Sequence, residues 1–348
     1  MTNKQKTAKL RNMLQTAVQL ELSTIPPYMV ALLSIHPDAN SEAANLIRGV
    51  MMEEMLHLAL VANVTNAVGG TPIIDRNRIP SYPLQMNFEG QKFKDRDFPV
   101  NLARFSKENI STFMKIEEPQ DLAARPKARA MTEIDIPGLT IGQFYLNIIA
   151  LLEELNEDED LFTGDASRQL IDNYYWGGGA HIIPVSDLDS AKRALDIVIR
   201  QGEGAWRQPG VRVLTPEQPL FMGHYYRYAE IYYKRHYNDA DDPAKPPTGT
   251  PLPVDYKKVY PIKTNPKSSD YNRTPELATL NAQFNARYTE MLQQLAQGIS
   301  GTPKTLYTAI MNGMHTIAPI ASQMMCIPVK GDRQKTTGCP TFEWWAGR

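Results

Sequence analysis

Apolar residues recur at helical spacing along two long segments near the start of the chain. Residues 7–34 carry them three or four positions apart, and residues 41–68 repeat the pattern after a short turn. Pro26 and Pro27 fall inside the first segment, where we expect a kink or a break, because proline removes a backbone donor from a helix. The Gly69–Gly70 pair suits the end of the second helix. The short turn between the segments predicts an antiparallel helix pair.

The rest of the chain alternates irregular stretches with further helices. Residues 71–136 contain scattered prolines and no sustained period, so we expect an irregular insertion with one short helix at about 101–115. Residues 238–275 are rich in proline, lysine and aspartate, which favours an extended wrap. Further helices are predicted over 140–156, 187–203, 220–237, 275–298 and 305–325. Many helices and few strand signals favour an all-α fold with a helical bundle at its core.

The domain organisation follows from this pattern. We assign residues 1–237 to the bundle, with the irregular insertion at about 71–136 inside it. Residues 238–348 are expected to form the wrap and extra C-terminal helices, packed on the bundle as one structural unit. The uncharged stretch 305–329 contains too many polar residues for a membrane span and is predicted to be a buried or docking helix.

The second helix carries acids and an imidazole on the side that should be buried. Successive helical residues lie about 100° apart, which places Glu54 and His57 inside the apolar stripe that includes Leu46 and Val61. Glu53 falls close to the same stripe, so at least one of the two adjacent glutamates must face inward. Buried carboxylates are unfavourable unless something compensates their charge.

Other helices add inward-facing acids. Glu21 lies in the apolar stripe of the first helix, and Glu203 continues an apolar row of the 187–203 helix. The apolar stripes offer no obvious basic partner, and Arg227 is the nearest candidate. The positive charge of a metal ion would compensate buried carboxylates. The Glu-x-x-His spacing also directs an oxygen ligand and a nitrogen ligand to one volume, as metal binding requires. Imidazole with several carboxylates suits iron or manganese, and the absence of cysteine ligands argues against structural zinc.

The remaining histidines are harder to assign from spacing. His224 could be a core or capping histidine, and Glu230 lies about 120° away from it around the same helix. His36, His181, His236 and His315 lack inward acidic company and are interpreted as structural.

Composition excludes several classes of protein. The net charge is -1, from 37 basic and 38 acidic residues, which gives no reason to expect a nucleic-acid or membrane partner. The two cysteines are too few for a disulfide framework, and the first residues contain no uninterrupted apolar core of a secretory signal. A cytoplasmic location is therefore expected. The sequence leaves a homo-oligomer open.

Several long motifs resemble one known family. "LQTAVQLELSTIPPYMVALLSI", "EEMLHLALVANVTNAVGGTP", "IPVSDLDSAKRALDIVIRQGEGAW", "HYYRYAEI" and "CPTFEWW" occur in order over nearly the whole chain. Together they resemble the ferritin-like domain family typified by iminophenyl-pyruvate dimer synthases, enzymes of bisindole pigment pathways of the violacein and rebeccamycin type. The resemblance implies a ferritin-like bundle that holds a non-haem iron centre.

The resemblance also implies a set of ligands. By motif match the metal ligands would be Glu21, Glu54, His57, Glu203 and His224, with Glu230 as a further ligand or supporting group. Family members often carry an acid in the "TIG-x-FY" segment, where this chain has Gln143. A neutral residue there would leave one ligand position uncharged, so both one and two ions stay open.

The function expected on this basis is that of an iron-dependent, dioxygen-using oxidoreductase. Its substrate would be a small molecule derived from an amino acid, as in the dimer synthases. Tyr28 and Arg227 are the candidate catalytic groups, and Arg227 could pair with a substrate carboxylate. The alternative is a metal-binding or ferroxidase-type protein without organic chemistry.

Overall fold

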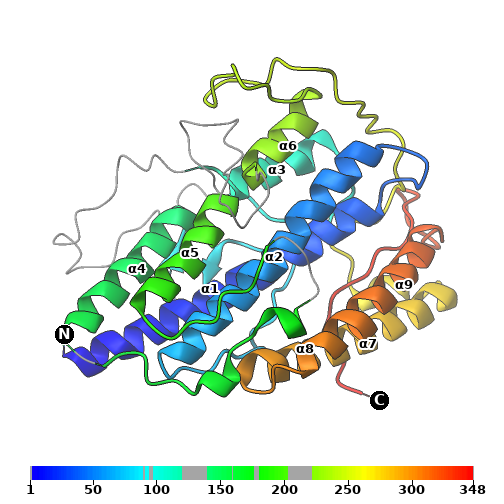
Figure 1. Ribbon diagram of the computed structural model, residues 1–348. Coiled ribbons are helices and arrows are strands. Elements are labelled where there is room, and N and C mark those ends of the chain that lie inside the picture. Colours follow the sequence, from blue (N-terminus) through cyan, green and yellow to red (C-terminus); the bar gives the residue numbers. More distant parts are fainter. Residues whose placement is uncertain are drawn as a thin grey trace.

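Two long antiparallel helices form the axis of the molecule. The computed structural model describes residues 2–88, 91–93, 97–119, 139–158, 160–175, 180–202 and 222–347. Helix α1 (Asn3–Leu33) packs along α2 (Ser41–Ala67), as Figure 1 shows. Arg11, near the start of α1, donates hydrogen bonds of 3.1 and 2.7 Å to the carbonyl of Val68 at the end of α2. The predicted antiparallel pair is confirmed.

Four shorter helices cover one side of this pair in two sets. Helices α4 (Ile141–Asp158) and α5 (Leu188–Gly202) pack together on one half of its length. Helices α3 (Lys107–Ile116) and α6 (His224–Tyr233) pack together on the other half (Figure 1). The bundle therefore has two continuous helices, while its other two positions are each shared by two short helices. The ends of those short helices meet near the middle of α1 and α2.

The C-terminal helices form a further layer. Helix α7 (Pro275–Ser300) packs against α2, and α9 (His315–Met325) packs against both α7 and α1. Between them, α8 (Thr305–Thr308) continues into a π-helical segment, η6 (Ala309–Met314). The remaining elements are short: β1 (Asn87–Phe88) and β2 (Gln91–Lys92), which pair antiparallel, and the 3₁₀ turns η3 (Ala166–Arg168), η4 (Asp172–Tyr174) and η5 (Ser268–Tyr271).

The two prolines of α1 do not break the helix, so of the expected kink or break the break is ruled out. Both are buried, and α1 runs through them to Leu33. Pro27 has no N–H to donate to the Ser23 carbonyl, which a regular helix would pair with it. The hydroxyl of Tyr82 donates to that carbonyl instead, at 2.7 Å. A contact from a distant segment thus compensates the bond that proline removes.

The predicted helix ends mostly agree with the structure. Gly69 adopts a φ of 68° directly after α2, a conformation that glycine tolerates without strain. Helix α3 begins at Lys107 because Ser106 caps it by accepting from the Asn109 N–H at 3.1 Å. Helix α6 ends earlier than expected, because Lys234 turns into the left-handed region at φ 59°.

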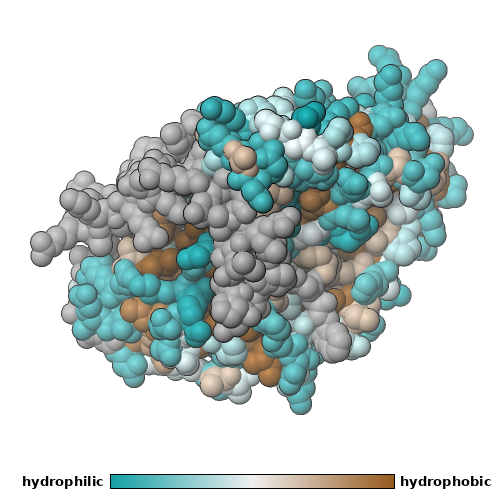
Figure 2. Space-filling model, turned by 45° about the horizontal axis from the view of Figure 1, so that its top comes forward, coloured by the Kyte–Doolittle hydropathy of each residue, from teal (hydrophilic) through white to brown (hydrophobic). Residues whose placement is uncertain are grey.

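The face of the molecule drawn in Figure 2 is mainly hydrophilic where it is coloured. Figure 2 shows teal residues over most of the coloured face, with smaller hydrophobic areas between them. None of the helices in the described part of the chain combines the length and apolar character needed to cross a bilayer.

Candidate metal centre

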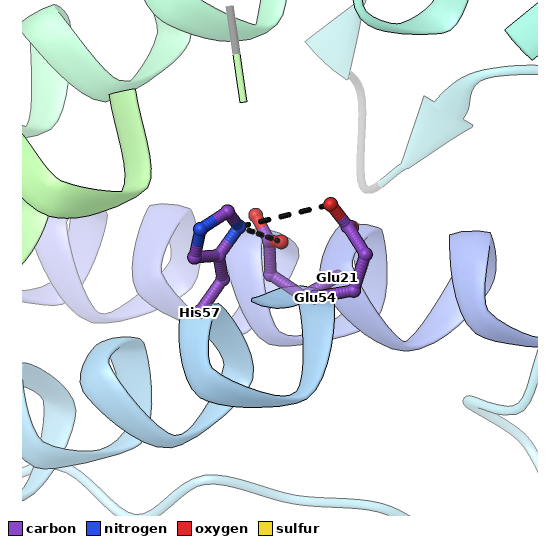
Figure 3. A group of neighbouring side chains, drawn as sticks. All are labelled: Glu21, Glu54 and His57. Atoms are coloured by element: carbon purple, nitrogen blue, oxygen red, sulfur yellow. Dashed lines mark ion pairs between the residues drawn. The ribbon is translucent and has the colours of Figure 1, made fainter. Parts of the chain in front are cut away.

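Three of the sequence-predicted residues meet between α1 and α2. Glu21 projects from α1, and Glu54 and His57 project from adjacent turns of α2 toward it (Figure 3). The Nδ1 atom of His57 lies 3.4 Å from Oε2 of Glu21 and 3.7 Å from Oε1 of Glu54. All three side chains are buried. The helical spacing therefore places the carboxylates of Glu21 and Glu54 and the Nδ1 atom of His57 close together.

A second group of donors shares Glu54 with the first. His224, the first residue of α6, places Nδ1 2.9 Å from Oε1 of Glu54 and 3.5 Å from Oε2 of Glu117. In each of the two groups the potential ligand atoms lie within 4.8 Å of one another. The two imidazole rings stack with centroids 5.4 Å apart and an interplanar angle of 19°. Glu54 is thus placed to bridge two neighbouring positions.

Both histidines turn the same nitrogen inward. Nε2 of His57 forms a 2.9 Å hydrogen bond to the side-chain amide oxygen of Gln201, and Nε2 of His224 forms a 2.9 Å hydrogen bond to the carboxylate of Glu53. An amide oxygen and an ionised carboxylate accept hydrogen bonds, so Nε2 of each ring carries the proton. Nδ1 of His224 is buried and unpaired, since its short contact with Glu54 lacks hydrogen-bond geometry. A buried imidazole nitrogen that faces two carboxylates would, once deprotonated, present its lone pair to a metal ion.

Hydroxyl groups hold the three carboxylates in place. Tyr145 of α4 donates to Glu21, and Tyr28 of α1 donates to Glu117. Thr24 donates to Oε2 of Glu54 at 2.6 Å. Each acid therefore has a fixed orientation and still presents a second oxygen to the centre.

Burial makes the uncompensated cluster electrostatically unfavourable. Desolvation is the main cause that raises the pKa of Glu21 to about 7, against the lowering effect of the Tyr145 hydrogen bond. Desolvation, followed by the charges of Glu117 and Glu21, raises the pKa of Glu54 to about 7. The nearest guanidinium, that of Arg227, is already paired with Glu53 at 2.8 Å. A divalent cation would supply the missing positive charge.

The two histidines respond to this environment in opposite ways. Burial lowers the pKa of His57, so its neutral form is favoured. Burial also opposes the charged form of His224, but the carboxylates around it, that of Glu117 above all, raise its pKa well above the usual value. A bound cation would take the place of a proton on Nδ1.

The donor set fits iron or manganese. It consists of carboxylate oxygens and imidazole nitrogens, which suit these metals, and a bundle core is where such centres are built. Cys326 is exposed and Cys339 is buried elsewhere, and neither belongs to the donor groups found among the described residues. The residues present therefore fit the metal that the sequence suggested.

Two predicted site residues, Glu230 and Arg227, are placed outside the donor groups, and a third lies outside the described residues. Glu230 is buried, but its oxygens accept from the Tyr237 N–H at 2.8 Å and contact His236 at 3.3 Å, so it is not brought into the cluster. Arg227 contacts the cluster through Glu53 and is engaged there. Glu203 lies outside the described residues. Tyr28 lies beside the cluster through its bond to Glu117.

Glu117 was missed by the sequence analysis, and Gln143, whose role was left open, caps a helix in the structure. Glu117 follows the last residue of α3, beyond the helix expected at 101–115, and its only sequence signal was an acid directly after the apolar residues of that helix. Gln143 is a capping residue: its side chain accepts from the Thr140 N–H at 2.9 Å, while Thr140 Oγ1 accepts from the Gln143 N–H at 3.1 Å. It does not substitute for a ligand in this geometry, so it gives no reason to expect fewer ions.

A small cavity adjoins the donors. It measures about 20 Å³, enough for one water-sized molecule. Besides the acids, its walls come from α4 and α5 and include Ile141, Gly142, Tyr145, Val198, Ile199 and Gly202. The cluster is thus enclosed mainly by apolar surface and glycine backbone.

Comparisons with known proteins agree with this architecture. A family model described as ferritin-like matches residues 14–233. A curated protein named dichlorochromopyrrolate synthase, from Lentzea aerocolonigenes, is 26% identical over 332 residues, which correspond to 85% of this chain and 29% of that protein's length. A crystal structure of a ferritin-like protein from Caulobacter vibrioides aligns with a TM-score of 0.55 over 96% of this chain and 97% of that one, at 21% identity. The all-α bundle predicted from the sequence is confirmed.

Proposed function

Because the chain belongs to the ferritin-like family, we propose that it is an iron-dependent oxidoreductase that uses dioxygen on a small organic substrate. The observation that carries the proposal is the pair of donor groups that share Glu54, each with an inward histidine Nδ1. The residues proposed to hold two ions are Glu21, Glu54, His57, Glu117 and His224. Manganese is the alternative metal for the same donors. Glu203 and Glu230 stay predictions as additional or supporting groups.

The protein's own groups would prepare the centre for this chemistry. Bound iron supplies the one-electron redox steps that reaction with dioxygen requires. Glu53 and Gln201 keep each histidine in the tautomer that exposes Nδ1. The hydroxyls of Tyr28 and Tyr145 orient the outer carboxylates and offer protons beside them. Apolar walls exclude bulk water from the site.

The substrate class is proposed from the relative and the sequence resemblance. The relative from Lentzea aerocolonigenes is named as a synthase, and this chain corresponds to 29% of its length. We propose an amino-acid-derived molecule for this chain by analogy. Arg227, which the sequence offered as a partner for a substrate carboxylate, forms its ion pair with Glu53, and we assign it to that contact.

One observation favours a second candidate function. Among the described residues, the cavity beside the donors measures about 20 Å³, which is room for a water-sized molecule. A ferroxidase, whose reductant is ferrous iron itself, needs no larger space. The two candidates share the metal centre and differ in what is oxidised.

Metal loading followed by oxygen consumption tests both. Metal-free protein is loaded anaerobically with Fe²⁺ and its metal content is measured per chain, beside Glu54→Ala and the exposed control Glu42→Ala on the same helix. We expect about two ions in the wild type and in the control, and loss of most metal in Glu54→Ala, because Glu54 belongs to both groups. Unchanged metal content in Glu54→Ala would disprove the assignment.

Oxygen uptake then separates the candidates. Consumption that continues with excess amino-acid or imino-acid substrate at catalytic iron supports the oxidoreductase. Consumption that stops when the added Fe²⁺ is exhausted, with no effect of any organic molecule, supports the ferroxidase.

A further inference from the structure

The two inward-facing histidines differ in the partner that holds their outer nitrogen. Nε2 of His224 donates to a carboxylate oxygen of Glu53 at 2.9 Å. Nε2 of His57 donates to the neutral amide oxygen of Gln201 at the same distance. All four residues are at most 3% exposed, so solvent does not weaken the difference between the charged and the neutral acceptor.

Glu53 is fixed as an ionised group. A guanidinium nitrogen of Arg227 contacts both of its oxygens, at 2.9 and 2.8 Å. Arg227 is held in turn by a 2.7 Å bond from Nε to the Met222 carbonyl. The carboxylate therefore stays an acceptor for the His224 proton and cannot rotate away. Gln201 lies near the end of α5 and carries no formal charge.

The nature of this partner affects how strongly a histidine binds metal. A carboxylate that accepts the outer N–H makes the imidazole a better electron donor, and loss of such a partner typically weakens metal binding about 10- to 100-fold. An amide oxygen fixes the same tautomer with a weaker effect, because the bond is not charge-assisted. Among the described residues the two positions have otherwise similar donors, since each combines Glu54, one further carboxylate and one imidazole.

We propose that the two metal positions are inequivalent, and that the position at Glu54, Glu117 and His224 binds its ion first and more tightly than the position at Glu21, Glu54 and His57. Glu53 acts as the positioning residue of the first position, and Gln201 as that of the second. This inference rests on the proposed metal centre and adds an order of loading to it. The ion at His57 is the exchangeable one.

Stepwise titration with exchanged partners tests the proposal. Anaerobic calorimetry of Fe²⁺ added to metal-free protein should resolve two binding steps whose affinities differ about 10-fold or more. Glu53→Gln should weaken the tight step about 10- to 100-fold and leave the weak one in place. Gln201→Glu should strengthen Fe²⁺ binding in the weak step and reduce the difference in affinity between the two steps. Both substitutions keep the size of the side chain and change only the acceptor.

The two variants also separate an electronic role from a structural one. Glu53→Gln leaves Arg227 without its counter-charge, so its fold is checked by circular dichroism. Gln201→Glu keeps the Glu53–Arg227 pair intact and decides the question alone if the first variant does not fold. ¹⁵N NMR of the imidazoles, with Zn²⁺ as a diamagnetic probe, should show metal on Nδ1 and the proton on Nε2 of both rings.

Each outcome has one meaning. Two binding steps of equal affinity in the wild type would overturn the inference, and so would an unchanged affinity difference in Gln201→Glu. Neither result would contradict the proposed metal centre. No binding of Fe²⁺ by the wild type would instead remove the proposed function itself.

Discussion

At the scale of single residues, a shared glutamate organises the site. Glu54 contacts both histidines, while Glu21 and Glu117 each serve one side. Helical periodicity could predict Glu21, Glu54 and His57, because their spacing on one helix face is a local property. It could not predict Glu117, because only tertiary packing brings the end of α3 to α2. His224 was supported only by the family resemblance, since its own helix gave no sign of its direction.

Removal of the missed ligand should cost one ion. We expect Glu117→Gln to retain about one metal ion per chain, because the group at Glu21, Glu54 and His57 remains complete. Metal content by mass spectrometry measures this. The neighbouring Glu118 is exposed, so Glu118→Gln is the matched control and should keep the wild-type content. Equal metal content in the two variants would contradict the role of Glu117.

The raised carboxyl pKa values predict how metal uptake depends on pH. At pH 6 the carboxyls of Glu21 and Glu54, with pKa values of about 7, are mostly protonated in the metal-free protein. Metal must displace these protons, so proton release on binding should be larger at pH 6 than at pH 8.5, and affinity should rise between them. Calorimetry in buffers of different ionisation enthalpy counts the protons. Release of the same number of protons at both pH values would contradict the raised pKa values of Glu21 and Glu54.

The same shifts affect the stability of the metal-free protein. A carboxyl whose pKa is raised from 4.5 to about 7 on folding favours the folded state below pH 4.5, and this contribution is lost as pH rises through 7. The loss is on the order of a few kcal/mol, since one pKa unit corresponds to about 1.4 kcal/mol. Denaturant unfolding at pH 6 and 8.5 should show a smaller loss in Glu21→Gln than in the wild type. If the free energy of unfolding depended on pH identically in Glu21→Gln and in the wild type, Glu21 would not be a source of the pH-dependent loss of stability.

At the scale of elements, helix ends supply much of the site. His224 begins α6, Gln201 lies one residue before the end of α5, and Glu117 follows α3 directly. The sequence predicted the helices well, because amphipathic periodicity specifies them. It did not show that the helix continues through Pro26 and Pro27, where Tyr82 satisfies the freed carbonyl, and it left the role of Gln143 open, where a local capping bond explains the residue. Both depend on contacts that the helix pattern does not contain.

The capping role of Gln143 has a direct test. Gln143→Ala should lower the free energy of unfolding by about 0.5–1 kcal/mol, because α4 loses half of its capping box. Metal content should stay that of the wild type. Gln143→Glu should preserve both stability and metal content, since glutamate accepts the same bond from Thr140. A gain of metal in Gln143→Glu would show that this position faces the ions.

At the scale of the whole molecule, the C-terminal helices are built into the bundle. One hydrophobic cluster contains Leu10 and Phe342 and spans the described chain between them. Asn66 of α2 donates to the Ile299 carbonyl of α7 at 2.8 Å, and the Tyr260 N–H donates to the Ser34 carbonyl at 2.8 Å. A cavity of about 60 Å³ lies at this boundary, with walls from α1, α2, α7 and η6. On these contacts we expect a single structural unit, which stays a prediction.

Cooperative unfolding would follow from this packing. We expect amide hydrogens of α2 and α7 to exchange with the same protection against global unfolding, because removal of either helix exposes the core of the other. Hydrogen exchange with mass spectrometry on the full chain measures both. Early exchange throughout α7 while α2 stays protected would show that the C-terminal part is a separate unit.

The central claim is a dinuclear centre bridged by Glu54. Anomalous diffraction at the iron edge, from crystals loaded anaerobically with Fe²⁺, tests it most directly because it locates each ion. We predict two peaks, one among Glu21, Glu54 and His57 and the other among Glu54, Glu117 and His224. No peak between these side chains, or iron bound only elsewhere on the protein, would contradict the claim.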